Sequence, residues 1–246
     1  MSSTDQIYSQ RQDHVVDFVF DKKVVDVFGD MIRRSIPGYE SILSMLPVLG
    51  SQYIKNGTNV YDIGCSLGAG LMAISARIKH ADIPPGVHYH AVDPSPEMLE
   101  KCRHNLASFI PVEQLTLVAE PIQNLQMQNA SLVLMNFTLQ FVPPEDRLDA
   151  VGRIYRGLNP GGVLLLSEKW HSEDSVHEEE LAKLHHRFKS MNGYSDLEIS
   201  QKRSALEKVM ITDSFQSQCE RLRVAGFAII IPWFQCLNFA SILAIK

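Results

Sequence analysis

Apolar residues recur at helical spacing near the start of the chain. The pattern runs from Phe20 to about Ile54, and the helix breaker Ser35-Ile36-Pro37-Gly38 interrupts it. We therefore expect two or more helices in this region. They follow a polar, loosely ordered arm over residues 1–20.

From Thr58 onward, short apolar runs typical of buried strands alternate with helical patterns. A helix is expected from Ser95-Pro96, because serine suits the N-cap and proline the first turn. The expected strands lie at 58–64, 87–93, 115–118, 131–137 and 162–168, and further helices at 67–80 and 144–155. This alternation predicts an α/β fold with a doubly wound, mostly parallel sheet and helices on both faces.

The C-terminal part departs from this alternation. Residues 170–210 are polar with helical spacing, which predicts a helical insertion. Thr212-Asp213-Ser214 is expected to cap one more helix. The apolar runs 227–234 and 235–246 predict a closing antiparallel strand pair.

The composition is ordinary for a globular protein, with 45% apolar and 21% charged residues. Without a repeat or linker, we expect one domain over 1–246, with 1–54 as its N-terminal arm and helical cap. A net charge of −5 argues weakly against a nucleic-acid surface. No apolar run suits a membrane span or signal peptide. The scattered cysteines favour free thiols, so we expect a cytoplasmic protein.

The carboxyl ends of the strands are where a doubly wound sheet binds its ligand. The loops after Asp62, Asp93, Val118 and Asn136 should therefore line the site. No metal site is expected, because His88 and His90 alternate on one strand without a third ligand.

The strand-to-helix turn after Asp62 carries the first candidate motif. Gly64, which has no Cβ, lets the backbone pass close to a ligand, and the next helix points its N–H groups into that gap. The spacing is GxSxG (Gly64 to Gly68) rather than the GxGxxG of dinucleotide sites. A tight turn without a ligand is an equally good reading of this motif alone.

The second motif, Asp93-Pro94-Ser95-Pro96, follows the next strand. A carboxylate there can accept hydrogen bonds from both ribose hydroxyls of an adenosine group. The alternative is that Asp93 only supplies negative charge to the N-terminus of the following helix. The third motif, Leu158-Asn159-Pro160-Gly161-Gly162, is a turn between a helix and a strand.

Taken in this order, the three motifs resemble the class I methyltransferases that use S-adenosylmethionine (SAM), from about residue 58 to the end. A nicotinamide enzyme is the alternative for the fold, and the missing GxGxxG counts against it. A more specific resemblance is to the carboxy-SAM synthases. It is carried by VFGDMIRRSIPGY (27–39), YDIGCSLG (61–68), NFTLQF (136–141), NGYS (192–195), EISQKR (198–203) and WFQCLNF (233–239).

This resemblance implies an unusual reaction. SAM receives a carboxyl group on its sulfonium methyl from prephenate, which leaves as phenylpyruvate. The product, carboxy-SAM, then serves a second enzyme that modifies a wobble uridine of tRNA (cmo5U34). The resemblance further implies a homodimer that needs neither tRNA nor a membrane.

The resemblance also implies roles for particular residues. Asn136 is expected near the sulfonium, and Arg203 is expected to bind the carboxylate that distinguishes carboxy-SAM from SAM. Pro121 and Ile122 fall in the adenine loop, where the family has Asp and this chain has Glu120-Pro121. The remaining ligand contacts are expected from Tyr39, Gly64, Cys65, Ser66, Asp93 and Pro94.

Simpler readings of these residues stay open. Tyr39 can be a cap to the Pro37-Gly38 turn, Cys65 a small turn residue, and Arg203 a solvated charge on a polar helix. An ordinary methyltransferase acting on a metabolite or RNA shares the SAM motifs but has no use for Arg203. A SAM-binding subunit without catalysis is the third hypothesis.

Overall fold

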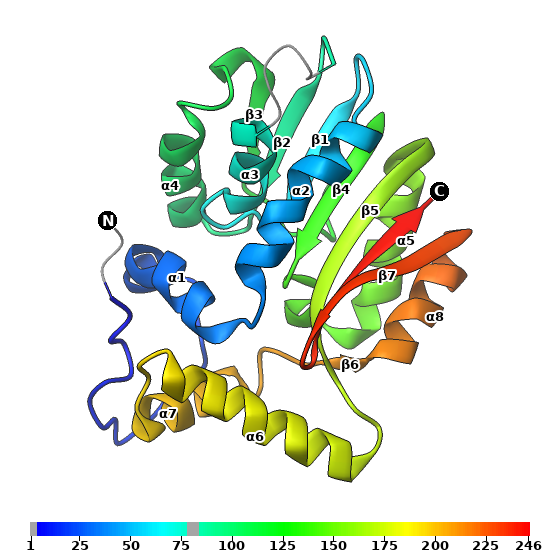
Figure 1. The fold of residues 1–246 in the computed structure, drawn as a ribbon. Coiled ribbons are helices and arrows are strands. Elements are labelled where there is room, and N and C mark those ends of the chain that lie inside the picture. Colours follow the sequence, from blue (N-terminus) through cyan, green and yellow to red (C-terminus); the bar gives the residue numbers. More distant parts are fainter. Residues whose placement is uncertain (1–3, 78–83) are drawn as a thin grey trace.

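A central sheet organises the computed structural model, which describes residues 4–77 and 84–246. Its strands follow the order β3-β2-β1-β4-β5-β8-β7, and the short β6 pairs with β5 (Figure 1). Strands β1 to β5 run parallel, whereas β8 lies antiparallel between β5 and β7. The predicted fold class, including the closing antiparallel pair and the N-terminal helices, is confirmed.

The bounds of the elements follow the predicted pattern. The strands are β1 (Asn59–Ile63), β2 (His88–Val92), β3 (Leu115–Val118), β4 (Ala130–Asn136), β5 (Leu158–His171), β6 (Asp213–Ser214), β7 (Ile229–Cys236) and β8 (Phe239–Ile245). The α-helices are α1 (Lys22–Ser35), α2 (Tyr39–Tyr53), α3 (Ala69–Arg77), α4 (Pro96–Leu106), α5 (Arg147–Gly157), α6 (Ser175–Met191), α7 (Asp196–Leu206) and α8 (Phe215–Ala225). Short 3₁₀ turns are η2 (Val112–Gln114), η3 (Leu139–Phe141) and η4 (Pro144–Asp146). The last part of the expected helix 67–80, residues 78–80, lies outside the described residues.

Several boundaries differ from the prediction; β7 and β8, for example, start at Ile229 and Phe239 rather than at residues 227 and 235. The helix expected from Pro144 starts as the 3₁₀ turn η4 and becomes α-helical only at Arg147. Strand β5 starts at Leu158 rather than at residue 162, because Leu158 already pairs with Ala130 of β4 before a shift in register. The Pro-Gly-Gly turn is therefore part of the strand.

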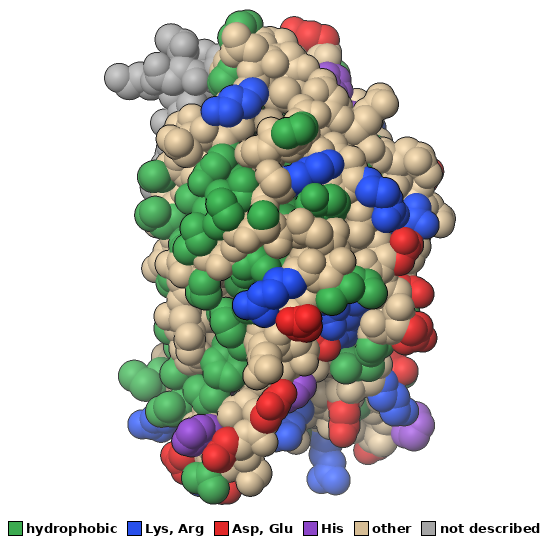
Figure 2. Space-filling model, turned by 90° about the vertical axis from the view of Figure 1, so that its right-hand side faces the viewer, with side chains coloured by type: hydrophobic (Ala, Val, Ile, Leu, Met, Phe, Trp, Pro, Cys, Tyr) green, Lys and Arg blue, Asp and Glu red, His purple; other side chains and the backbone are tan. Residues whose placement is uncertain are grey.

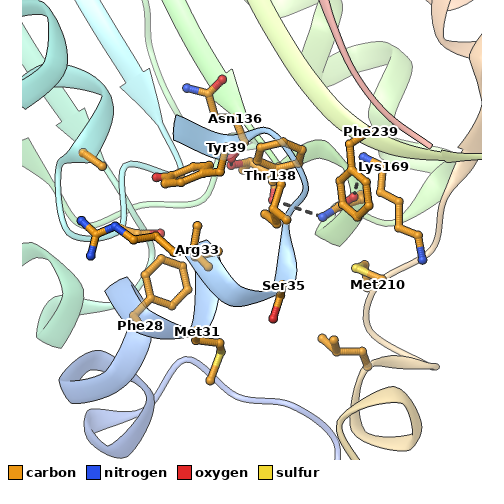
Figure 3. Close-up of a pocket in the computed structure, with 18 of the residues that line it drawn as sticks. Phe28, Met31, Arg33, Ser35, Tyr39, Asn136, Thr138, Lys169, Met210 and Phe239 are labelled. Carbon is orange, nitrogen blue, oxygen red and sulfur yellow. Dashed lines mark hydrogen bonds between the residues drawn. The ribbon is translucent and has the colours of Figure 1, made fainter. Parts of the chain in front are cut away.

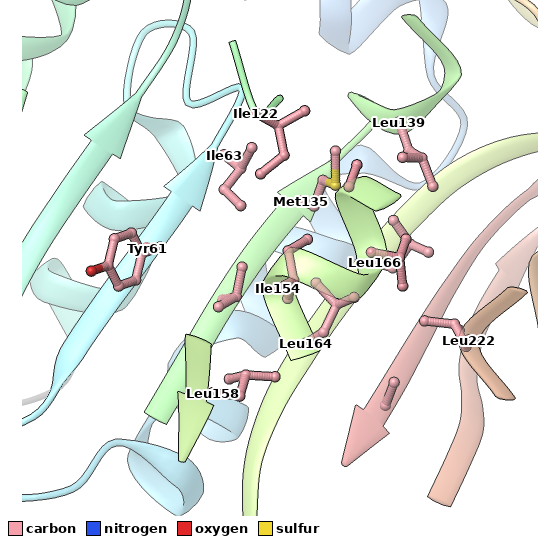
Figure 4. Packing of buried hydrophobic residues seen from close by; sticks show 14 of the residues in the cluster. Tyr61, Ile63, Ile122, Met135, Leu139, Ile154, Leu158, Leu164, Leu166 and Leu222 are labelled. Carbon is pink, nitrogen blue, oxygen red and sulfur yellow. The ribbon is translucent and has the colours of Figure 1, made fainter. Parts of the chain in front are cut away.

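Hydrophobic clusters cover both faces of the sheet. On one face, Ile154 of α5 and Leu222 of α8 pack over Met135 and Leu164 of the strands (Figure 4). The other face is covered by α2, α3 and α4 through Leu46, Leu71, Ile74, Leu99 and Cys102. Because both faces are buried, the strand ends are the part of the sheet left for a ligand. Within the described ranges, the structure contains no helix long and apolar enough to cross a membrane.

The N-terminal arm is better anchored than its polar sequence suggests. Residues 4–20 form no helix or strand, yet Asp5 is only 2% exposed. Its carboxylate accepts a hydrogen bond from the Tyr194 hydroxyl (2.5 Å) and lies 3.5 Å from the Lys202 ammonium. Its backbone N–H donates to Asp30 of α1 (2.8 Å). The expectation of a loosely ordered arm is therefore wrong, because buried polar contacts fix the arm to α1 and to the helical insertion.

A buried arginine joins α5 to the segment before α8. The Arg147 side chain is 1% exposed and pairs with Asp213 at 2.7 Å. Its guanidinium also donates to the carbonyl oxygens of Val142 (2.9 Å), Gln140 (3.3 Å) and Ile211 (2.7 Å). It thus satisfies three backbone acceptors of the turns η3 and η4 and their surroundings.

We predict that Arg147→Met lowers the free energy of unfolding by about 3–5 kcal/mol, because buried acceptors lose their donor and a buried ion pair is broken. Urea denaturation measures the change. Arg153→Met, on the same helix but in a largely exposed pair with Asp149, is the control and should change little. An equally small effect of Arg147→Met would contradict the structural role given to this network.

Candidate active site

A cavity of about 1140 Å³ lies at the carboxyl ends of the parallel strands. Its upper wall is formed by the ends of β1, β2, β4 and β5, and helices α1, α2, α3, α6 and α7 and the start of β8 contribute further walls (Figures 1 and 3). The N-terminal helices and the helical insertion thus meet the sheet at one place. Apolar side chains such as Phe28, Met31 and Phe239 line much of it.

The Asp93 carboxylate holds two loops of the cavity together. One of its oxygens accepts a hydrogen bond from the Ser66 N–H and the other from the Ser95 N–H, both at 2.9 Å. Burial raises the pKa of Asp93, whereas these two N–H donors lower it. Each oxygen keeps a lone pair for a further donor. This arrangement fixes a carboxylate beside the glycine turn, as an acceptor for ribose hydroxyls requires.

The Gly64 turn is shaped by a close approach of Thr138. Gly64 has φ +70°, and a Cβ added there would lie 2.2 Å from the Thr138 hydroxyl oxygen. Ser66 also adopts a positive φ, of 48°, although it is not glycine. The turn is therefore packed against the loop after β4, and glycine is required at position 64 on both steric and conformational grounds.

Asp62 was not among the predicted ligand contacts, yet its carboxylate lines the cavity and is 3% exposed. Its Oδ2 atom has no hydrogen-bond partner among the described residues. Burial, the largest cause, and the charge of Asp93 raise the pKa of Asp62 to about 7, although the hydrogen bond from the Leu71 N–H lowers it in part. An unpaired buried carboxylate oxygen at a cavity wall suits a cationic group of a ligand. The signal in the sequence was an acidic residue at a strand end, two positions before Gly64.

Asn136 ends β4 and lines the cavity (Figure 3). Its Oδ1 accepts a hydrogen bond from the Ser167 hydroxyl (2.8 Å), which in turn lies 2.6 Å from the Ser241 hydroxyl. These contacts fix the side-chain amide by its oxygen. The Nδ2 group is therefore the atom that Asn136 can offer to a ligand as a donor.

Tyr39 starts α2 and faces the same space (Figure 3). Its ring centre lies 6.3 Å from that of Phe137. Burial raises the pKa of its hydroxyl, and the nearby Asp62 charge raises it further. Tyr39 thus presents a neutral O–H donor and an aromatic face.

Basic side chains gather on the other side of the cavity. Arg203 of α7 is exposed on the whole but lines the cavity, together with Lys169 at the end of β5 and Lys189 of α6. The Arg203 charge is near enough to lower the pKa values of both lysines. The cavity therefore combines carboxylates at the ends of β1 and β2 with cations at β5 and the insertion.

The structure brings most of the predicted site residues into this one cavity. The lining residues among them are Tyr39, Gly64, Cys65, Ser66, Asp93, Pro94, Asn136 and Arg203. Pro121 and Ile122 are not among the residues that line this cavity. Pro121 is exposed and Ile122 is buried in the hydrophobic core. Their contact with adenine stays a prediction.

The fold and the strand-end cavity are those of a class I methyltransferase. A family model described as a methyltransferase domain matches residues 61–164. An O-methyltransferase family protein from Burkholderia thailandensis superposes with a TM-score of 0.65 at 16% identity, covering 92% of this chain and 60% of that one. At this identity the likeness concerns the fold alone.

Full-length relatives define the family more narrowly. The chain is 46% identical to the carboxy-S-adenosyl-L-methionine synthase of Cronobacter sakazakii, over 100% of this chain and 98% of that protein. It is 47% identical to the Vibrio parahaemolyticus protein of the same name, with the same coverage. The chain belongs to the carboxy-S-adenosyl-L-methionine synthase family.

The contact between Gly64 and Thr138 yields a prediction about stability. Gly64→Ala should lower the free energy of unfolding by about 1–3 kcal/mol, since alanine is strained at this φ and collides with Thr138. In the double variant with Thr138→Ala, part of this loss should be recovered, because two of the three colliding atoms are removed. Urea denaturation of the three variants measures it; simple additivity of the two changes would contradict the close packing.

Proposed function

We propose that this protein converts SAM and prephenate into carboxy-SAM and phenylpyruvate. Carboxy-SAM is then the donor for carboxymethyl transfer to a wobble uridine (cmo5U34) of tRNA. The observation that carries this proposal is Arg203, an arginine without an ion-pair partner among the described residues, in the cavity that holds the SAM motifs. SAM itself has no carboxylate on its methyl carbon, so it offers no partner at that position. The family relationship supports the same reaction.

The strand ends hold SAM in this proposal. The Asp93 carboxylate accepts from the ribose hydroxyls, since its position is already fixed by Ser66 and Ser95. The turn of Gly64, Cys65 and Ser66 surrounds the methionine end. The unpaired Asp62 oxygen is the acceptor for the methionine ammonium group, because the cation compensates a buried carboxylate.

Asn136, Tyr39 and Arg203 surround the reacting methyl group. Asn136 donates through Nδ2, and Tyr39 contributes its ring and hydroxyl from the start of α2 (Figure 3). Arg203 pairs with the carboxylate that the methyl group acquires, in a charge-assisted hydrogen bond that SAM cannot make. In these roles Asn136 and Tyr39 contact SAM and carboxy-SAM alike, whereas Arg203 favours carboxy-SAM.

Bound SAM supplies the chemistry, because its sulfonium acidifies the methyl C–H bonds, while loss of carbon dioxide and hydroxide aromatises prephenate. The protein's part is to hold the two molecules together and to keep bulk water away from the acidified carbon. Helices α1, α2, α6 and α7 provide that shielding with apolar side chains such as Phe28 and Met31 (Figure 3). The atoms balance, since the lost hydroxide and the methyl proton form water.

The proposal includes a cytoplasmic homodimer that acts on small molecules and leaves tRNA binding to the next enzyme. The face shown in Figure 2 mixes basic, acidic and hydrophobic side chains. The net charge is −5. Both features differ from the basic surface that binds nucleic-acid phosphates. All four cysteines are free thiols, which suits a reducing compartment.

Mass spectrometry tests the reaction directly. Purified protein incubated with SAM and prephenate should yield carboxy-SAM and phenylpyruvate, and ligand released from freshly purified protein should contain carboxy-SAM. Reactions without prephenate or with heat-denatured protein are the controls. Recovery of SAM alone after incubation with prephenate would contradict the proposal and favour a conventional methyltransferase.

A further inference from the structure

Two lysines that line the cavity have no ion-pair partner among the residues the structure describes. Lys169 stands at the end of β5, and Lys189 lies on α6, one turn after His185. By contrast, Lys202 of α7 pairs with Asp5, and Lys183 of α6 pairs with Glu179 and Glu180. Lys169 and Lys189 are both partly buried. Partly buried ammonium groups without a counterion are costly, which makes them candidates for binding an anion.

The positive charges lie close enough to perturb each other. Burial, the largest cause, and the charges of Lys169, Lys202 and Arg203 together lower the pKa of Lys189 to about 8. Burial also lowers the pKa of Lys169, and Glu178, the acidic group that acts on it, offsets only part of this. The cavity therefore holds more positive charge than its acidic groups near β5 compensate.

His185 completes this region as a neutral group. Its Nε2 lies 2.8 Å from the Ser35 carbonyl oxygen, which fixes Nε2 as a donor. Burial, the largest cause, and the charges of Lys189 and Lys169 together lower the pKa of His185 to about 3. The ring packs edge-on against Phe239, with centres 5.0 Å apart. His185 therefore gives the region an uncharged wall that defines its shape.

The order of the strands places these lysines beyond the SAM site. Asp93 follows β2, Gly64 follows β1, Asn136 ends β4, and Lys169 lies near the end of β5. These strands are neighbours, so each step along the sheet is about 4.8 Å. Lys169 is thus one strand past Asn136, and Figure 3 shows it extending away from the strand end, towards Met210. A second reactant facing the sulfonium belongs on this side.

We propose that Lys169 and Lys189 form a subsite for the carboxylate that the second substrate keeps, with Phe239, Met210 and His185 as its apolar walls. The inference rests on the proposed function, in which prephenate carries two carboxylates. One is transferred and passes to Arg203, whereas the other stays on phenylpyruvate as part of a 2-oxo acid. Ligands of the subsite are therefore small aromatic or cyclic 2-oxo acids.

Lys169→Met and Lys189→Met test the subsite, because methionine keeps the length of the side chain and removes the charge. Each should raise the KM for prephenate about ten- to a hundredfold, the effect expected of a lost charge-assisted hydrogen bond. The Kd values of SAM and carboxy-SAM should stay within about twofold of those of the unmodified protein, because neither ligand has the retained carboxylate. Lys208→Met, an exposed charge outside the cavity lining, is the matched control.

Phenylpyruvate binding gives a readout that does not depend on turnover. Calorimetric titration of phenylpyruvate into SAM-saturated protein should show binding that either variant weakens about tenfold or more and that Lys208→Met leaves unchanged. The melting temperature of each ligand-free variant should equal or exceed that of the unmodified protein, since repulsion between the lysines is relieved.

The subsite would be overturned if both variants left the KM for prephenate and the affinity for phenylpyruvate unchanged. It would also be overturned if the variants weakened SAM binding as much as phenylpyruvate binding, with or without a lower melting temperature. Failure of the unmodified protein to form carboxy-SAM would count instead against the proposed function. The phenylpyruvate titration would then still decide whether the lysines bind the acid.

Discussion

Four neighbouring parallel strands end at one edge of the sheet, and this geometry positions the groups that the sheet contributes to the cavity. The order β2, β1, β4, β5 sets Asp93, Gly64, Asn136 and Lys169 side by side at about the spacing of the strands. The backbone hydrogen bonds between the strands fix that spacing. The order of these side chains along the edge therefore sets the order in which they can contact the ligands. In the proposed function, acceptors for the ribose hydroxyls and the ammonium group of SAM lie at one end, and cations for carboxylates lie at the other.

The insertion adds positive charge that the sheet does not provide. Helices α6 and α7 carry Lys189, Lys202 and Arg203 to the cavity, and the Asp5 carboxylate on the N-terminal arm compensates only Lys202. The arm also holds α7 through Gln201, whose amide donates to the carbonyl oxygens of Tyr8 and Gln10 (both 2.9 Å). The arm thus stabilises the insertion while leaving the other charges free for a ligand. Unpaired charges in a binding site lower the stability of the ligand-free protein, and they are retained because they bind the ligand.

Much of the fold was predictable because its signals are local. A few adjacent residues are enough to predict the buried strands β1 and β4. The same holds for the N-cap of α4, where the Ser95 hydroxyl accepts a hydrogen bond from the Met98 N–H at 3.2 Å. The resemblance led to Arg203, which composition alone marks as a surface charge. The buried position of Asp5 was not predictable, because its partners Tyr194 and Lys202 lie almost the whole chain away.

The parts of the site that escaped prediction have the same cause. Among the described residues, the Asp62 oxygen has no hydrogen-bond partner and Lys169 and Lys189 have no ion-pair partner. These properties depend on which groups from distant parts of the chain come near them, so no local pattern reveals them. The adenine loop shows the reverse case. Position after β3 placed Pro121 and Ile122 at a strand end, but Ile122 packs into the core instead of lining the cavity.

The central claim is that the insertion turns a SAM site into one that recognises a carboxylate, and Arg203 tests it most directly. Calorimetric titration of SAM and carboxy-SAM against the unmodified protein, Arg203→Ala and Arg203→Lys separates the two ligands. The account predicts that Arg203→Ala weakens carboxy-SAM about ten- to a hundredfold and leaves SAM nearly unchanged. Lysine should restore part of the loss, because it keeps the charge without the planar pair of donors. Equal losses for both ligands would contradict the claim and make Arg203 a structural residue.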